Sequence, residues 1–289
     1  MTSAPPAPLR TPPPVYTAGL LAPLHAELMA LLRALAPADW ERPTVAGRWR
    51  VRDVAAHLLD GGLRRLSFHR DGHRPPGGPG EGFVALVHFI DRLNADWIEV
   101  ARRLSPRVLV DLLASTGPAL DEFLASLPPH EPAFFPVAWA GEGASEHWMD
   151  VGREYTERWH HQAQIRDAVG APPLAGQRWL APVIALSVRA LPRALARVRA
   201  ADGAAVVVRV TGEGGGAWSL VRQRGAWALG EGAAPAPAAT VTVADDDAWR
   251  LLFNALTPEE AARRAVLEGD PTLGAAVLRG RAVMVADPP

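Results

Sequence analysis

The spacing of apolar residues changes once along the chain, near Asp202, and this change sets the fold class. Before it, apolar residues recur every three or four positions, which predicts helices over about 17–36, 51–70, 83–104, 105–127, 145–169 and 174–199. After it, short β-branched or alternating segments between Gly or Pro predict strands over 204–211, 217–222, 226–231 and 240–244. Helical segments then follow from Asp245 to Leu278. The sequence therefore predicts an α+β fold, in which an up-down four-helix-type bundle precedes a small α+β domain with a mainly antiparallel sheet.

Helix boundaries and composition divide the chain into three parts. Residues 1–14 are rich in proline and lack the pattern of a signal peptide, so we expect a flexible leader. Residues 15–200 form the predicted bundle and residues 201–289 the small α+β domain. We expect Ser145 to cap the helix over 145–169, Gly170 to close it, and Pro182 and Pro192 to kink the helix over 174–199. No apolar run approaches the roughly 18–20 residues of a membrane span, so we expect a cytoplasmic protein without a membrane partner.

The absence of two residue types removes several classes of chemistry. The chain has no Cys, which excludes disulfide scaffolds, cysteine zinc sites, iron–sulfur clusters and a cysteine nucleophile. It also has no Lys, so Schiff-base chemistry and a phosphate-binding lysine are excluded. The 30 basic residues are balanced by 31 acidic ones, giving a net charge of -1. A nucleic-acid partner normally requires a basic excess, so none is expected.

The stretch Val151–Ile165 contains the residues best suited to chemistry. Glu157 and His161 are four apart on a predicted helix and therefore project from one face, with Glu154 one turn earlier. A carboxylate and an imidazole at this spacing can bind one metal ion, and a third ligand from another helix completes a facial triad with open positions. His57 is the best third ligand, because it lies in an apolar helical setting where a buried imidazole needs a partner.

Other interpretations of these residues remain open from spacing alone. Glu157 and His161 are also compatible with an exposed helix pair, and His57 with a core histidine whose hydrogen bonds are satisfied. His160 adjoins His161 and forms a competing pair with Glu157 at i, i+3. Glu154 is a candidate base or alternative ligand, or a surface acid.

Two segments resemble motifs of a known superfamily. Trp49-Arg-Val-Arg-Asp-Val-Ala-Ala-His57-Leu58 resembles the second-helix signature of the DinB-like superfamily, in the branch named for mycothiol-dependent maleylpyruvate isomerase. Glu157-Arg-Trp-His-His161-Gln-Ala-Gln-Ile165 resembles the fourth-helix metal motif, and this register favours His161 over His160. The resemblance implies His57, Glu157 and His161 as metal ligands. Arg50 stands where such motifs carry a small capping hydroxyl, so that helix loses a side-chain cap. The segment after residue 202 resembles a sterol-carrier-protein-like domain.

The resemblance implies a mechanism in which the reacting thiol comes from a co-substrate. The expected cofactor is a divalent metal, zinc in the first place with nickel and iron as alternatives, and the co-substrate is a low-molecular-weight thiol such as mycothiol or bacillithiol. The metal favours the thiolate, which adds to a small-molecule electrophile in an isomerase or a thiol S-transferase. Two other functions stay open: a metal hydrolase that uses metal-bound hydroxide, and a non-catalytic small-molecule or lipid-binding protein. A monomer or a homodimer is expected.

Four further residues are candidates for the site. His147 stands fourteen residues before His161, on one helix stripe with Glu154, and is a candidate proton carrier. Arg222 and Arg224, at a strand turn of the second domain, are candidates for binding a carboxylate, because guanidinium binds carboxylate bidentately. The competing interpretations are a surface position for His147 and a solvated hairpin for the two arginines.

Overall fold

A computed structural model describes residues 10–73 and 77–285, and its chain divides into two compact units. The helical unit contains Val15–Ala138 and Glu142–Leu174, and the sheet unit contains Trp139–Gly141 and Ala175–Val283 together with the described residues before Val15. The predicted α+β class is confirmed. The units divide near residue 175, earlier than the boundary expected between residues 200 and 201, because the helices after Leu174 pack on the sheet.

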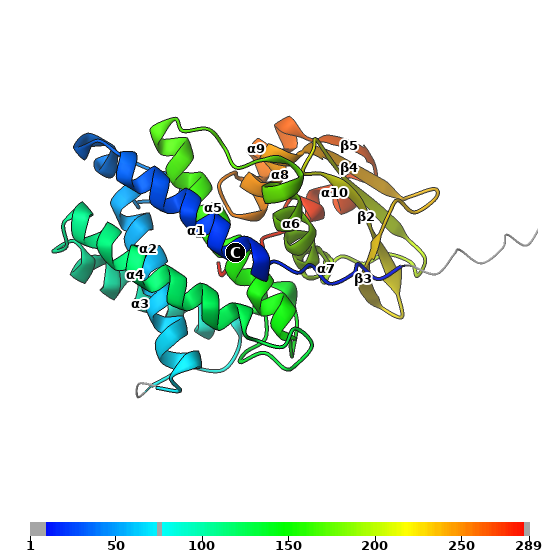
Figure 1. Cartoon of the computed structure of the whole chain (residues 1–289). Helices are drawn as coiled ribbons and strands as arrows, with labels where there is room; N and C mark the ends of the chain where they lie inside the picture. The colour runs from blue at the N-terminus through cyan, green and yellow to red at the C-terminus, as the bar shows by residue number, and fades with distance from the viewer. Residues whose placement is uncertain (1–9, 74–76, 286–289) are drawn as a thin grey trace, which may run out of the picture. The chain divides into compact units, whose positions relative to one another are not determined.

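Five α-helices make up most of the helical unit (Figure 1): α1 (Ala18–Ala34), α2 (Val51–Arg65), α3 (Phe83–Ala101), α4 (Pro106–Ala125) and α5 (His147–Val169). Short 3₁₀ turns lie at η1 (Pro37–Glu41) and η3 (Ala138–Ala140), and one turn of π-helix, η2 (Leu66–Arg70), extends α2. Helix α1 packs on α4 and α5, while α2 packs on α3, α4 and α5. Their apolar faces form a core that includes Leu28, Trp40, Val54, Leu59, Leu113 and Ile165.

Local signals explain where these helices begin and end. Ser105 accepts a hydrogen bond from the Val108 N–H and Pro106 occupies the first turn, as expected for the start of α4. Arg50 gives α2 no side-chain cap; instead the Asp53 carboxylate accepts a hydrogen bond from the Arg50 N–H at 3.0 Å. Gly170 closes α5 in the left-handed conformation, at φ 70°.

The expected cap of α5 is wrong. Glu146 occupies the cap position, and Ser145 instead donates to the Glu142 carboxylate and accepts from the Val137 N–H. The hydroxyl of Ser145 therefore ties down the connection before α5 and leaves the helix N-terminus without a side-chain cap.

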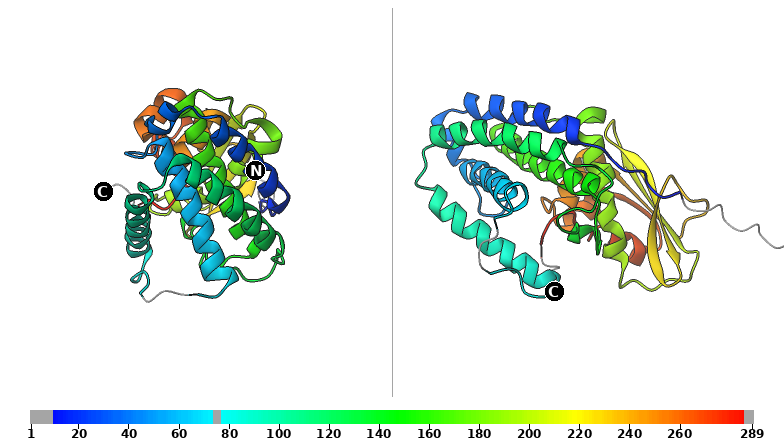
Figure 2. Two further views of the ribbon diagram at one scale, coloured as in Figure 1. Left: turned by 60° about the vertical axis from the view of Figure 1, so that its left-hand side comes forward. Right: turned by 60° about the horizontal axis from the view of Figure 1, so that its bottom comes forward.

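Among the described residues, the sheet unit carries five strands in the order β3-β2-β1-β4-β5: β1 (Ala205–Thr211), β2 (Gly216–Gln223), β3 (Ala226–Glu231), β4 (Ala239–Ala244) and β5 (Val266–Gly269). Figure 2 shows the sheet from two further directions. Only the β1–β4 pair is parallel; in its register Val208 lies opposite Val241. The other three pairs are antiparallel, so the predicted mainly antiparallel sheet is confirmed. Strand β5 was not expected from the sequence.

Several helices cover the sheet: α6 (Gly176–Ser187), η4 (Val188–Ala190), α7 (Leu191–Leu195), α8 (Asp245–Leu252), α9 (Pro258–Arg264) and α10 (Pro271–Val277). The single kinked helix expected over 174–199 is thus three segments. Helix α7 packs on β3, whereas α8 and α10 pack on β1 and β4. A small cavity of about 20 Å³ remains between the valines of β1 and β4 and the leucines of the covering helices.

The N-terminal segment was expected to be a flexible leader, and residues 1–9 of it lie outside the described residues. The rest of the segment is held against the sheet unit. The Arg10 carbonyl accepts from the Glu231 N–H at 2.8 Å, and Arg189 donates to the carbonyls of Pro12 and Pro13. Among the described helices, none is both long and apolar enough to cross a bilayer.

Candidate metal centre

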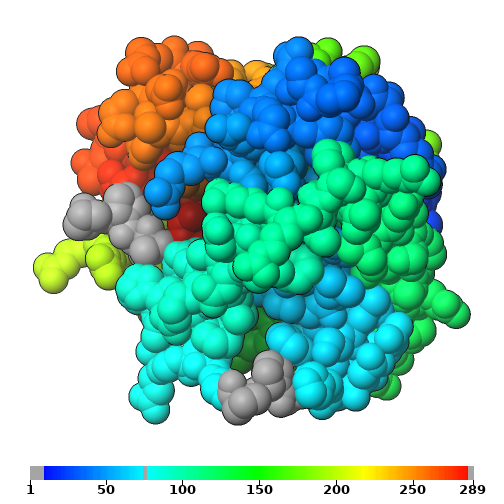
Figure 3. Space-filling model, turned by 90° about the vertical axis from the view of Figure 1, so that its left-hand side faces the viewer, coloured from blue at the N-terminus to red at the C-terminus, as the bar shows by residue number. Residues whose placement is uncertain are grey.

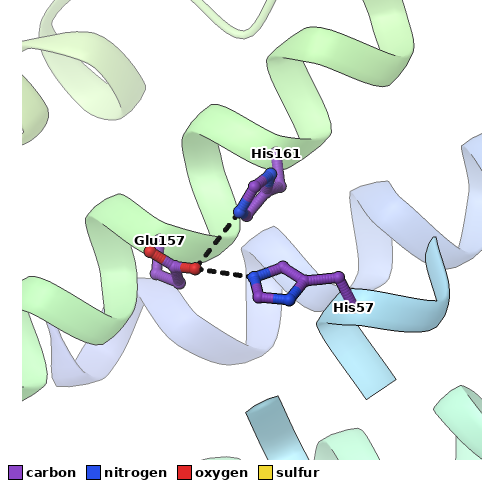
Figure 4. A group of neighbouring side chains, drawn as sticks. All are labelled: His57, Glu157 and His161. Carbon is purple, nitrogen blue, oxygen red and sulfur yellow. Dashed lines mark hydrogen bonds and ion pairs between the residues drawn. The ribbon is translucent and has the colours of Figure 1, made fainter. Parts of the chain in front are cut away.

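Helices α2 and α5 of the helical unit pack together and bring three distant residues into one cluster. His57 comes from the middle of α2, and Glu157 and His161 come from α5, where a spacing of four residues places them on one face (Figure 4). Helix α2 is also fixed next to His57, because the Trp97 indole of α3 donates to the Ala56 carbonyl at 2.8 Å. The predicted juxtaposition of His57, Glu157 and His161 is therefore present in the fold.

The ligand atoms of the three side chains converge. Glu157 Oε1 lies 3.0 Å from His57 Nε2 and 3.1 Å from His161 Nε2. One donor atom from each residue lies within 4.8 Å of the other two. Both imidazoles are buried, while the Glu157 side chain is 33% exposed, so solvent reaches the cluster at the carboxylate. Two imidazoles and a carboxylate in this arrangement can bind a divalent cation.

Gln164 indicates which nitrogen of His161 carries the proton. Its Oε1 lies 2.8 Å from His161 Nδ1, so Nδ1–H is positioned to donate and Nε2 is the nitrogen that faces the cluster. Nε2 lies 3.1 Å from Glu157 Oε1, where a bound cation would take the place of the hydrogen bond between them. An outer partner on the second nitrogen is the arrangement usual for a metal-binding histidine.

His57 is held by packing more than by hydrogen bonds. Its Nδ1 is buried and has no hydrogen-bond partner among the described residues, because Asp53 caps α2 and Asp60 pairs with Arg64. The Trp49 ring lies 4.8 Å from the His57 ring and 6.1 Å from the His161 ring, centroid to centroid. Trp49 therefore covers both imidazoles from one side.

The electrostatics of the cluster favour a neutral His57 and an ionised Glu157. Burial lowers the pKa of His57, and the hydrogen bond to Glu157 offsets this only in part. Burial opposes ionisation of Glu157, but attraction to His161 and hydrogen bonds to His161 and His57 outweigh it and hold the pKa of Glu157 well below its usual range. At neutral pH His57 and Glu157 are thus in the protonation states that metal binding requires.

His160, the competing candidate, is turned away from Glu157. Its Nδ1 lies 2.9 Å from the Thr156 carbonyl of the preceding turn, and burial lowers its pKa to about 3. Its ring instead packs against His161, with centroids 4.0 Å apart. The geometry places His161 in the cluster with Glu157 and leaves His160 as a packing neighbour.

Glu154 belongs to a buried ionic network, and the cluster does not include it. Arg158 contacts Glu154 Oε1 at 3.2 Å, and Arg153 contacts Oε2 at 3.0 Å. Burial opposes ionisation of Glu154, but Arg153, Arg158 and Arg65 together outweigh it and lower its pKa. With both oxygens held by arginines, Glu154 orients α5 against its neighbours.

His147 lies at the first turn of α5 and is remote from the cluster. At a rise of about 1.5 Å per residue, the fourteen residues to His161 span about 21 Å. Its Nδ1 lies 3.0 Å from the Pro128 carbonyl, and its ring packs against Phe134. The sequence pattern places His147 and His161 on one stripe of the helix, but the distance along the helix axis keeps them apart.

Arg222 and Arg224 belong to the sheet unit, and their contacts lie within it. Arg222, on β2, places its guanidinium 5.8 Å from the ring centre of Trp227 on β3. Arg224 is exposed and has a positive φ of 50° in the turn before β3. Their role in binding a carboxylate stays a prediction.

Two contacts of the site were not expected. Gln164 was visible only as part of the Gln-Ala-Gln sequence after His161, although its i+3 spacing places it on the same face. The packing of Trp49 on both imidazoles depends on the loop before α2. In that loop the Thr44 hydroxyl donates to the Trp49 carbonyl at 2.7 Å.

Residues 21–166 match the sequence profile described as Mycothiol maleylpyruvate isomerase N-terminal domain, which covers just over half of the chain. The chain belongs to this family. The matched region contains all three residues of the cluster, and the resemblance noted in the sequence is confirmed. No curated protein matches the sequence.

Two solved structures share the fold with this family member. One is a crystal structure of the mycothiol-dependent maleylpyruvate isomerase, with a TM-score of 0.54, and the other is a crystal structure of a mutant of that enzyme with one histidine replaced by alanine, with a TM-score of 0.55. Each is 11% identical, and each match covers 94% of both chains. The fold likeness therefore extends over both units.

Proposed function

We propose that this chain is a metal-dependent enzyme that uses a low-molecular-weight thiol and adds its thiolate to an electrophilic small molecule. The reaction is that of a maleylpyruvate-isomerase-like isomerase or of a thiol S-transferase. The observation that carries the proposal is the cluster of His57, Glu157 and His161 in a member of this family. Mycothiol is the first candidate thiol, since the relatives are described as mycothiol-dependent.

The residues present fit a bound divalent cation. One oxygen of Glu157 lies within hydrogen-bond distance of Nε2 of both imidazoles, and Gln164 contacts the other ring nitrogen of His161. We propose zinc, because two histidines and one carboxylate leave open positions on this ion. When bound, the ion would supply the positive charge that favours the thiolate form of the co-substrate.

The chain's own residues would prepare this site. His57 and His161 present their Nε2 atoms, Gln164 fixes the orientation of His161, and Trp49 shields one side of the imidazoles from water. The exposed part of Glu157 marks the side from which small molecules arrive. For isomerisation, the thiolate adds to an activated double bond and leaves again after rotation; for transfer, it displaces a leaving group and stays on carbon. The absence of Cys fits an enzyme whose reacting thiol is supplied by a co-substrate.

The alternative of a lipid-binding protein gains no support from the sheet unit. The cavity between the sheet and its helices measures about 20 Å³, which is about the space of one water molecule. A lipid chain would require the leucines and valines that line it to move apart.

The test combines metal analysis with a thiol panel on the purified full chain. We expect about one zinc per chain and turnover of maleylpyruvate that requires mycothiol, with both lost in His57→Ala and His161→Ala. His88→Ala, which changes an exposed histidine of α3, should leave both intact. Turnover without any thiol would support a metal hydrolase instead. No stoichiometric metal, together with unchanged activity in the two cluster variants, would overturn the proposal.

A further inference from the structure

Two residues in the Met149–Arg166 part of α5 are partly exposed to solvent. Between Met149 and Arg166 every residue of α5 is buried except Arg153 and Glu157. The exposed fractions of these two side chains are 19% and 33%. Because they are four residues apart, they lie on one face of the helix, one turn from each other. The side chains of Glu157 and Arg153 are therefore both partly exposed on the same face of α5.

The molecular surface is hollowed on this side of the helical unit. Figure 3 shows a hollow between the cyan surface of α3 and the blue surface of the region of α2, with green chain at its floor. The colour of the floor corresponds to the part of the chain around residue 150. The floor of this hollow therefore lies in the part of the chain that contains α5.

Neighbouring side chains fix the orientation of the Arg153 guanidinium. Its Nε contacts Asp150 Oδ1 at 3.4 Å, its Nη2 contacts Glu154 Oε2 at 3.0 Å, and the Phe135 ring centre lies 5.4 Å from Cζ. Nη1 has no hydrogen-bond partner among the described residues. Two of the five N–H groups of a guanidinium are thus used for anchoring, and the N–H pair on Nη1 remains available.

The two carboxylates that contact Arg153, Asp150 and Glu154, are also paired with other arginines. Arg65 also contacts Asp150, at 2.7 Å, and Arg158 also contacts Glu154, at 3.2 Å. Both of these arginines are buried and cannot reach solvent. Arg153 is therefore the member of this network that can accept an additional anionic partner.

We propose that Arg153 binds a carboxylate of the electrophilic substrate and thereby determines specificity for anionic substrates. A guanidinium edge with a free pair of N–H groups matches the geometry of a carboxylate. A carboxylate bound there lies one helical turn from Glu157, so a substrate of a few carbon atoms spans from Arg153 to the cluster. This inference rests on the proposed function, since it names the class of substrate for the same site.

The test measures binding of maleate, a small dicarboxylate, and of maleamide, its uncharged diamide, by titration calorimetry without thiol. We expect Arg153→Met to weaken maleate binding about 10- to 100-fold, because a charge-assisted pair is lost. Arg153→Lys keeps the charge but loses the planar fork, and we expect binding about fivefold weaker than in the wild type. Maleamide binding should change less than twofold in either variant. Arg52→Met, which removes an equally charged side chain that pairs with Glu41, is the matched control and should leave maleate binding unchanged.

Two outcomes would overturn the inference: no maleate binding by the wild type, or equal maleate affinity in the wild type and both Arg153 variants. Circular dichroism identifies a variant that has not folded, and Arg153→Lys decides the matter if Arg153→Met fails to fold. The titration is repeated in the His161→Ala background, where the proposed metal site is broken. Arg153-dependent binding that persists there supports the anion site even if metal and thiol dependence fail, so the two proposals can fail separately.

Discussion

The hydrogen bond between Gln164 and His161 gives the sharpest prediction about the cluster. Gln164→Met removes the acceptor that lies 2.8 Å from His161 Nδ1 and changes the buried volume little. His161 is then free to rotate or to change tautomer, so that Nε2 no longer presents a fixed lone pair to a cation. A buried hydrogen bond to a charged or polarised group contributes about 1.5–3 kcal/mol. At about 1.4 kcal/mol per tenfold change, zinc affinity should fall about 10- to 100-fold.

The assay is competition for zinc against a chromophoric chelator at neutral pH. Gln164→Glu keeps an acceptor at the same place and should bind zinc at least as tightly as the wild type. Gln162→Met makes the same chemical change two residues away, where the amide faces Leu24 and Leu28 of α1, and should leave zinc affinity within twofold. Thermal unfolding of the metal-free variants checks that each is folded. A zinc Kd for Gln164→Met within twofold of the wild type would refute the reasoning.

Three further predictions concern stability. Arg158→Met leaves the buried Asp121 without the guanidinium that lies 2.5 Å away, and it should lower the free energy of unfolding, measured in urea, by about 3–5 kcal/mol. The double variant Arg158→Met with Asp121→Leu should recover most of this lost stability. A single variant as stable as the wild type would contradict the prediction. The arginine partners of Glu154 lower its pKa from 4.5, so its ionised form stabilises the folded state. The stability advantage of the wild type over Glu154→Gln should therefore be full above about pH 5.5 and should decrease as the pH falls below 4.5. Urea unfolding at pH 7 and pH 4 measures this advantage, and an advantage that grows on acidification would show that the sign is wrong. A Cβ at Gly117 would lie 2.1 Å from His25 Cε1, so Gly117→Ala should destabilise the folded protein by about 1–3 kcal/mol. Gly61 has open space around it, so Gly61→Ala should be neutral or slightly stabilising. Thermal unfolding of both variants measures the difference.

Apolar periodicity predicted most helices and strands because they have one buried face. It predicted the extent of α1, α2 and β3 within a few residues, since Leu21, Leu24 and Leu28 of α1 follow the helical repeat. Strand β5 could not be found in this way: all four of its residues are exposed, and it exists because Val241 and Thr242 of β4 pair with it. The hydroxyl of Ser145 matched a local cap rule, but contacts in the preceding loop determined its actual partners.

The cluster was predictable from the sequence only as far as local spacing and a motif can reach. The i, i+4 spacing of Glu157 and His161 is local, and the apolar helical setting of His57 together with the motif resemblance supplied the third residue. The network around Glu154 was not predictable, because Arg65 and Asp121 come from α2 and α4. Since every residue of α5 between Met149 and Arg166 is buried except Arg153 and Glu157, its polar residues carry no amphipathic pattern that would distinguish a ligand from a structural charge.

The hundred residues that separate His57 from Glu157 determine the order in which the protein can mature. In an unfolded chain, closing this loop costs entropy, whereas Glu157 and His161 are local and need no such closure. The complete donor set exists once α2 has docked on α5. On the proposed function, metallation would follow folding, and a bound ion would stabilise the folded chain in proportion to the logarithm of free metal over its dissociation constant. A limited supply of the proposed metal would then leave a pool of folded protein that the metal could activate without refolding.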